Sequence, residues 1–149
     1  MVITVPVAPQ PKRRIRASAS GGRVVPYKDR ATRIFERSVA LYLRQYAPLH
    51  PIEGPVAITL AFVHARPRRL LQNTTRGKPI PDGLIPKATT PDIDNLCKAV
   101  FDSAQVAGFF RDDCQVSELH ALDFYAERSG KPRIEISIKP QGVSDAHED

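Results

Sequence analysis

Apolar and polar residues alternate in several stretches of the chain, which predicts strands with one buried face. The clearest stretch is residues 55–64, where one face carries Val56, Ile58, Leu60 and Phe62. A second stretch lies at residues 133–138, where the alternating residues are Ile134, Ile136 and Ile138. Residues 2–7 predict a short strand, and residues 116–125 predict another that a turn at 129–132 joins to the last strand.

A helical spacing of apolar residues predicts a helix that ends at Gly108. Its apolar residues occupy positions i, i+3, i+4, i+7, i+8 and i+11, namely Ile93, Leu96, Cys97, Val100, Phe101 and Ala104. We expect Asp94 or Asn95 to cap the start of this helix and Gly108 to close its end.

A second helix is predicted earlier in the chain. Asp29 or Thr32 can cap its start, and Pro48 stops it after about Tyr46. Its apolar residues are Ile34, Phe35, Val39, Leu41, Tyr42 and Leu43. The patterns therefore predict two main helices and at least four strands.

The segments between these elements show no periodicity. Residues 65–90 carry four prolines, two glycines and six Arg or Lys residues, so we expect a long, flexible basic loop. We also expect residues 17–22 to be flexible and the polar residues 140–149 to form a disordered tail. A chain of 149 residues with 42% hydrophobic residues usually forms one domain, which we place at residues 1–139.

The composition argues against several classes of protein. No apolar run approaches the length that spans a membrane, and the first residues lack the basic region of a secretory signal. We therefore expect a cytoplasmic protein without a membrane partner. Two cysteines do not make a disulfide framework, and Cys97 and Cys114 form no C-x-x-C pair, so we expect reduced thiols rather than a zinc site.

The net charge of +6 conceals two halves of opposite sign. Residues 1–90 hold 16 Lys or Arg against 4 Asp or Glu, a balance of +12, whereas residues 91–149 hold 6 against 12, a balance of −6. Basic segments release counterions when they bind phosphates, which favours DNA as a partner of the first half. The candidate DNA-binding residues are Lys12, Arg13, Arg14, Arg16, Arg66, Arg68, Arg69, Arg76, Lys78 and Lys87.

Aspartates gather in the acidic half. Five of them fall between residues 92 and 113, and Asp123 follows. Asp92 and Asp94 precede or begin the predicted helix, and Asp112 and Asp113 follow it. If the first pair is extended, its side chains project to the same side, and Asp94 lies where the helix dipole favours a carboxylate. A strand that returns alongside the helix would bring Asp112 or Asp113 back to them.

Lys98 and Asp102 continue a polar stripe from Asp94, one and two helical turns further on. Each feature taken singly has a structural interpretation, because an Asp before a helix caps it and Lys98 can pair with a neighbouring Asp for about 0.2–0.5 kcal/mol. Taken together, beside a basic half-chain, they favour a site for a hard divalent cation. Carboxylate oxygens suit Mg²⁺, and bound Mg²⁺ lets an acidic site hold a phosphodiester.

These residues resemble the RusA family of Holliday junction resolvases, the crossover junction endodeoxyribonucleases common in prophages. The strongest part is Pro-Asp-Ile-Asp-Asn-Leu-x-Lys-x-x-x-Asp at residues 91–102, followed by Gly108 and by Asp-Asp-x-Gln-Val at residues 112–116. The basic segment Pro-x-Pro-Lys-x-Arg-x-Arg at residues 9–16 also resembles the opening of the family. The long loop at residues 65–90 departs from the family, whose compact members shorten it.

The resemblance implies a homodimeric α+β nuclease, and we expect a small mixed or antiparallel sheet with two main helices packed on it. It implies that Asp92, Asp94 and Asp113 are catalytic carboxylates that bind Mg²⁺, with Mn²⁺ as a substitute, and that Lys98 is an essential lysine. Asp112 would be their neighbour. The implied substrate is branched DNA, the four-way Holliday junction of DNA recombination and repair, which the enzyme would cut by paired symmetric nicks.

Two other functions fit the same residues. One is a non-enzymatic DNA-binding protein whose acidic cluster is a structural cation site. The other is a metal nuclease that acts on flaps or single strands. Mg²⁺-dependent nicking of a synthetic four-way junction separates the first from a resolvase, and a comparison of junction, flap and linear duplex separates the second.

Overall fold

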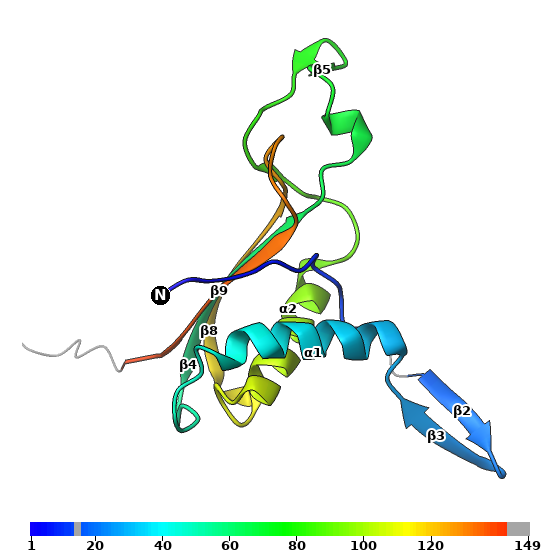
Figure 1. Cartoon of the computed structure of the whole chain (residues 1–149), viewed down its shortest axis with the longest axis vertical. Helices are drawn as coiled ribbons and strands as arrows, with labels where there is room; N and C mark the ends of the chain where they lie inside the picture. Colours follow the sequence, from blue (N-terminus) through cyan, green and yellow to red (C-terminus); the bar gives the residue numbers. More distant parts are fainter. Residues whose placement is uncertain (14–15, 143–149) are drawn as a thin grey trace, which may run out of the picture.

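The computed structural model describes residues 1–13 and 16–142. Its elements are β1 (Ile3–Val5), β2 (Arg16–Ser20), β3 (Arg23–Tyr27), α1 (Arg30–Arg44), β4 (Val56–His64), η1 (Arg68–Leu70), β5 (Thr74–Thr75), β6 (Lys78–Pro79), β7 (Ile85–Pro86), α2 (Ile93–Ala107), η2 (Asp113–Gln115), β8 (Val116–Tyr125) and β9 (Arg133–Pro140). A five-stranded sheet has the order β1-β9-β4-β8-β7, and α1 and α2 pack on it (Figure 1). This single α+β domain with a mixed sheet confirms the predicted fold class.

The central strand of the sheet is β4, which runs parallel to β8 and antiparallel to β9. The parallel pairing follows from α2, because a helix that crosses between two strands lets both run in the same direction. β8 and β9 are consecutive in the chain, yet β4 lies between them. The predicted turn at residues 129–132 therefore joins two strands that are not neighbours in the sheet.

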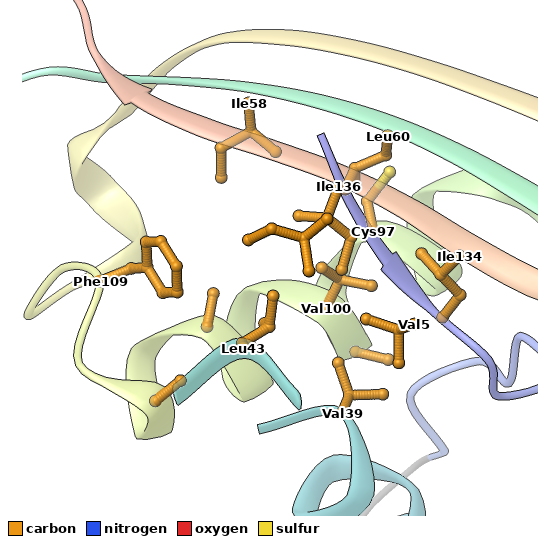
Figure 2. Close-up of a cluster of buried hydrophobic side chains, with 14 of the residues drawn as sticks. Val5, Val39, Leu43, Ile58, Leu60, Cys97, Val100, Phe109, Ile134 and Ile136 are labelled. Atoms are coloured by element: carbon orange, nitrogen blue, oxygen red, sulfur yellow. The ribbon is translucent and has the colours of Figure 1, made fainter. Parts of the chain in front are cut away.

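The hydrophobic core lies between the sheet and the two helices (Figure 2). Ile58 and Leu60 of β4 are fully buried there, together with Leu43 of α1 and Val100 of α2. Cys97 lies in the same cluster as a buried free thiol, and burial raises its pKa to about 11. Each buried aliphatic side chain contributes about 1.5–3 kcal/mol, so these contacts hold the helices on the sheet.

Helix α1 begins where its sequence predicts. The Oδ1 atom of Asp29 accepts a hydrogen bond of 2.8 Å from the backbone N–H of Thr32, so Asp29 is the N-cap residue. Hydrogen bonding from Thr32 also lowers the pKa of the Asp29 carboxyl. The buried residues of α1 recur at helical spacing and are Thr32, Phe35, Glu36, Val39, Ala40 and Leu43.

Helix α2 begins two residues earlier than its predicted cap. The carbonyl oxygen of Asp92 accepts a hydrogen bond of 3.2 Å from the N–H of Leu96. This is the first helical hydrogen bond, so Asp92 is the N-cap residue and Asp94 lies within the first turn. Gly108 has a φ of 94° and ends the helix in the left-handed conformation, which confirms the predicted C-cap.

Residues 17–22, predicted to be flexible, form part of a β-hairpin. β2 and β3 pair in antiparallel register around a two-residue turn at Gly21 and Gly22. Both glycines have a positive φ, of 58° and 77°, as such tight turns require. The hairpin projects away from the sheet and helices (Figure 1).

The segment predicted to be a flexible loop is also structured, and we call residues 65–86 the arm. The arm contains η1, β5, β6 and β7 and extends beyond the end of the sheet (Figure 1). The side chain of Arg66 is buried at its base and donates hydrogen bonds to five backbone carbonyls, those of Leu70, Pro81, Asp82, Gly83 and Ala126. The guanidinium of Arg128 adds bonds to the carbonyls of Leu71 and Gln72. Two arginines thus bind the backbone of the arm, beside the buried side chains of Leu70 and Ile80.

The C-terminal segment joins the sheet further than predicted. β9 continues to Pro140, and the N–H of Gln141 donates a hydrogen bond of 2.9 Å to the carbonyl of Pro55. The rest of the predicted tail, residues 143–149, lies outside the described residues. Neither α-helix in the described part of the chain has the length and apolar character needed to cross a membrane.

Candidate active site

The first turns of α2 present three of the four predicted catalytic residues on the surface. Asp92 and Asp94 are exposed at the helix N-terminus, and Lys98 follows one turn later. The Nζ atom of Lys98 lies 3.9 Å from Oδ2 of Asp94. The positive end of the helix dipole favours the ionised carboxylates at this position. Two carboxylates and an ammonium therefore share one solvent-facing end of α2.

A pocket of about 540 Å³ lies beside these carboxylates. Residues 87–93 and Asp123 line it, so Asp92 faces a cavity whose other wall is the end of β8. Lys87, Asp92 and Asp123 are its charged lining residues, and the carboxylates among them are groups that can bind a hydrated cation.

The Asp-Asp-x-Gln motif folds into the turn before β8. The Oδ1 atom of Asp112 accepts a hydrogen bond of 2.9 Å from the N–H of Cys114, which lowers the pKa of the Asp112 carboxyl. Gln115 completes this capping box and donates from its amide to the carbonyls of Ile52 and Gly54. Asp112 and Gln115 thus have structural roles, whereas the side chain of Asp113 is exposed.

Asp113 lies just before β8, whereas Asp123 and the pocket lie near the other end of that strand. Within residues 1–13 and 16–142, no three His, Cys, Asp or Glu side chains converge as metal ligands. A single chain thus does not bring Asp113 together with Asp92 and Asp94 in one ligand cluster. The remaining donor set still fits Mg²⁺, which usually binds to one or two carboxylates together with waters and substrate phosphates.

Asp102, the last residue of the predicted polar stripe, is paired with the N-terminal segment. The Nζ atom of Lys12 lies 2.9 Å from Oδ2 of Asp102, and this pairing with the carboxylate raises the pKa of Lys12. The N–H of Lys12 also donates to the carbonyl of Asn95. These two contacts fasten the N-terminal segment along α2, so the charge of Lys12 is already engaged.

Two of the predicted DNA-binding residues point into the protein, which corrects the sequence interpretation. Arg66 is only 9% exposed, and its guanidinium is used by backbone carbonyls. The Lys87 side chain is 4% exposed, and its Nζ atom lies 3.5 Å from Oδ2 of Asp123. The donors of both side chains are already used by acceptors of the same chain, so neither is an open phosphate contact like the exposed basic residues.

The other basic candidates differ in how far they are available to DNA. Arg68, Arg69, Arg76 and Lys78 are exposed on the arm, and the guanidinium of Arg69 lies 6.0 Å from the ring centre of Tyr125. The predicted DNA-binding residues of the N-terminal segment are either paired with an acidic residue or only partly covered by the described structure. An Nη atom of Arg13 lies 3.2 Å from Oδ2 of Asp29. Arg14 lies outside the described residues, and for Arg16 only the position in β2 is described.

A second basic surface was not singled out from the sequence. Helix α1 exposes Arg30, Arg33, Arg37 and Arg44. Their spacing of three, four and seven residues places them along one face of the helix. That spacing was the signal in the sequence that could have indicated a basic surface. It indicates one only when the opposite face of α1 is known to be buried.

The chain is similar to known proteins over nearly all of its length. The profile of a family described as Endodeoxyribonuclease RusA matches residues 6–139. The uncharacterized protein YqaN of Bacillus subtilis (strain 168) is 30% identical over 136 residues, which cover 91% of this chain and 93% of that protein. Crossover junction endodeoxyribonuclease RusA of Escherichia coli (strain K12) is 36% identical over 58 residues, which cover 39% of this chain and 47% of that protein. The protein of the same name from Shigella sonnei (strain Ss046) matches to the same extent.

The family match runs from just after β1 almost to the end of β9. It therefore includes the whole sheet except its first strand and last residue, both helices and the exposed carboxylates of α2. The resemblance seen in the sequence motifs is confirmed by this match over most of the chain. The chain belongs to the RusA family of endodeoxyribonucleases.

Proposed function

We propose that this protein is a Mg²⁺-dependent endodeoxyribonuclease that resolves four-way DNA junctions by paired symmetric nicks in recombination and repair. The observation that carries the proposal is the exposed group of Asp92, Asp94 and Lys98 at the N-terminus of α2. This group lies within the sequence motif that links the chain to the RusA family. E. coli RusA, a similar protein over part of its length, bears the name of a crossover junction endodeoxyribonuclease.

Asp92 and Asp94 are the residues that would hold the metal ion, with Mn²⁺ as a substitute for Mg²⁺. A bound ion of this kind lowers the pKa of water and stabilises charge on a leaving oxygen. Both carboxylates are exposed, so a phosphodiester can approach them without rearrangement of the helix. Asp113 is proposed as the third catalytic carboxylate from the family motif alone, since the described residues contain no cluster of three metal-ligating side chains that would include it.

Lys98 is proposed to stabilise negative charge on the phosphate during attack. Its ammonium lies one turn from the carboxylates, and its Nζ atom is 3.9 Å from Oδ2 of Asp94. A cation preorganised at this place would lose little energy to reorganisation when charge develops in the transition state.

The arm and α1 are proposed to contact the DNA backbone. Both expose basic side chains, whereas the acidic site by itself repels phosphates. Contacts of this kind supply affinity that is independent of sequence and weakens steeply with salt. They also position the duplex arms of a junction around the metal-binding carboxylates.

Paired nicking requires two active sites, and we propose a two-fold homodimer. A four-way junction has two-fold symmetry, so two identical sites can face opposed strands. The β2–β3 hairpin supports an association of chains, because it projects from the domain and exposes Val24, Val25 and Tyr27.

The test is gel cleavage of a labelled synthetic four-way junction with Mg²⁺ and with EDTA. A flap, a single strand and a linear duplex of the same sequence serve as comparison substrates. Symmetric nicks in the junction alone, and only with Mg²⁺, support the proposal. Junction binding without nicking would favour a non-enzymatic DNA-binding protein, and faster cleavage of flaps or single strands would favour a different nuclease.

A further inference from the structure

A buried carboxylate joins two basic side chains behind the candidate active site. Asp123 pairs in register with Phe62 of the parallel strand β4, so its side chain faces the helices as that of Phe62 does. The Nε2 atom of His64 lies 2.7 Å from Oδ1 of Asp123, and Nζ of Lys87 lies 3.5 Å from Oδ2. The side chains of all three are largely buried, with exposed fractions of 14% for His64, 9% for Asp123 and 4% for Lys87.

The two oxygens of Asp123 therefore serve different partners. Burial lowers the pKa of His64, which favours the neutral ring whose Nε2–H donates to the carboxylate. Lys87 supplies the positive charge that a buried carboxylate needs. Removing one partner of such a group leaves an uncompensated charge or an unsatisfied acceptor, so the three side chains hold one another in place.

Lys87 also holds the turn that carries Asp92. Its Nζ atom donates hydrogen bonds of 2.7 Å to the carbonyl of Thr89 and of 3.1 Å to the carbonyl of Thr90. Its backbone N–H donates to the carbonyl of Asp123 at 2.9 Å. Only Pro91 separates this clamped turn from Asp92.

The hydroxyl of Thr89 gives the turn a further anchor. It lies 2.9 Å from the hydroxyl of Tyr125, two residues beyond Asp123 on the same strand. The turn is thus fastened to the end of β8 by the side chain and the backbone of Lys87 and by Thr89. The same residues, 87–93 with Asp123, form the wall of the 540 Å³ pocket.

We infer that Lys87, Asp123 and His64 are positioning residues that set the place of the Asp92 carboxylate for metal binding. The inference rests on the proposed function in taking Asp92 as a metal ligand. His64 ends β4 and Lys87 follows β7, so the network also ties together the two ends of the arm. Its contribution is to the geometry of Asp92, since the polar atoms of the three side chains are occupied by one another and by the carbonyls of the turn.

The test compares Lys87→Met and Asp123→Asn with Glu118→Gln. The control removes a carboxylate from an exposed pair on the same strand, in which Nε2 of His120 lies 3.2 Å from Oε1 of Glu118. Mn²⁺ binding is measured on the free protein by electron paramagnetic resonance, and hydrogen exchange of residues 88–94 by mass spectrometry. Single-turnover junction cleavage is titrated with Mg²⁺, and junction affinity is measured in EDTA.

We expect both network variants to exchange faster at residues 88–94 and to bind Mn²⁺ about 10–100-fold more weakly, as is usual when a residue that orients a metal ligand is lost. The Mg²⁺ concentration for half-maximal cleavage should rise by the same factor, while junction affinity in EDTA stays that of wild type. Glu118→Gln should match wild type throughout. Unchanged exchange overturns the inference, and so does faster exchange with unchanged Mn²⁺ affinity.

If Lys87→Met and Asp123→Asn do not fold, a second pair of substitutions, both at His64, tests the inference. His64→Gln keeps a side-chain donor for Asp123, whereas His64→Leu removes it. The glutamine variant should retain the Mn²⁺ affinity that the leucine variant loses, and equal effects overturn the inference. A wild-type protein that binds Mn²⁺ but nicks no junction refutes the proposed function instead, and the Mn²⁺ comparison still decides the role of the network.

Discussion

The ammonium nitrogen of Lys98 lies 3.9 Å from Oδ2 of Asp94, and more than half of each side chain is exposed. An exposed pair at i,i+4 spacing contributes only about 0–1 kcal/mol to stability. Its place on the motif that resembles the RusA family agrees with the catalytic role proposed for Lys98. Several measurements separate such a role from a merely structural one.

Substitution of Lys98 by alanine should slow the chemical step without unfolding the protein. Loss of one preorganised transition-state donor costs about 10²–10³ in rate in other enzymes. Lys98→Ala should therefore bind junctions and melt like wild type, yet cleave at least about a hundredfold more slowly at saturating Mg²⁺. Single-turnover cleavage and thermal melting check this. A loss of activity only in proportion to a lowered melting temperature would return Lys98 to a structural role.

Replacing the proposed catalytic carboxylates should separate cleavage from binding. Cleavage should be abolished by each of Asp92→Asn, Asp94→Asn and Asp113→Asn, because each removes one of the carboxylates proposed for the metal site. Junction affinity in EDTA should persist or increase, since each change removes a charge that repels phosphate. Glu53→Gln, an exposed change outside the site, is the control. A near-normal cleavage rate for any one variant removes that residue from the proposed site. The result for Asp113 is the most informative, because its role is proposed from the family motif alone.

Arg66 should stabilise the arm as well as the protein. Arg66→Met leaves five backbone carbonyls without their donor, and buried unsatisfied groups cost about 1–3 kcal/mol each where water cannot replace the bond. We expect a lower urea midpoint and faster hydrogen exchange at residues 66–86. Arg76→Met, at an exposed position of the same arm, should change the free energy of unfolding by less than about 0.5 kcal/mol. Equal behaviour of the two variants would show that Arg66 does not organise the arm.

The exposed residues of the arm should determine part of the salt dependence of DNA binding. Each phosphate contact that is lost flattens the log–log slope of affinity against salt by roughly 0.9. The double variant Arg76→Ala, Lys78→Ala should therefore show a shallower slope than wild type. The double variant Lys131→Ala, Lys139→Ala removes the same charge from the other end of the chain and should leave the slope closer to wild type. Identical slopes for the two would mean that only net charge matters.

The acid sensitivity of the fold should depend partly on Asp29. Hydrogen bonding from Thr32 lowers its pKa in the folded protein below the ordinary value of 3.8. A depressed pKa means that this contribution to stability is complete above pH 3.8 and disappears as the pH falls through the folded pKa. Asp29→Asn keeps a cap acceptor but does not ionise, so its urea midpoint should fall less between pH 7 and about pH 2. Parallel curves for the two proteins would exclude this role.

Short-range signals in the sequence were sufficient for most of the regular elements. Alternation of apolar residues predicted β4 and β9, and helical spacing predicted α2 with its C-cap at Gly108. Asp29 was among the predicted caps of α1, because a short acceptor side chain before a helix satisfies an N–H that the helix leaves free. The position of the exposed carboxylates at the start of α2 could also be predicted from the sequence, since it depends on a few consecutive residues.

Only the tertiary structure decided which distant residues meet. The order of the strands, with β4 between β8 and β9, depends on the crossover of α2 and has no local signal. The arm was predicted to be part of a flexible loop because its residues show no periodicity. In the structure Arg66 donates to the carbonyl of Ala126, 60 residues away, and to four carbonyls of the arm itself. Lys87 was predicted to contact DNA, but its Nζ atom lies 3.5 Å from Oδ2 of the buried Asp123. Local preferences come from neighbouring residues, whereas the pairing of a buried charge depends on which partner the whole fold brings to it.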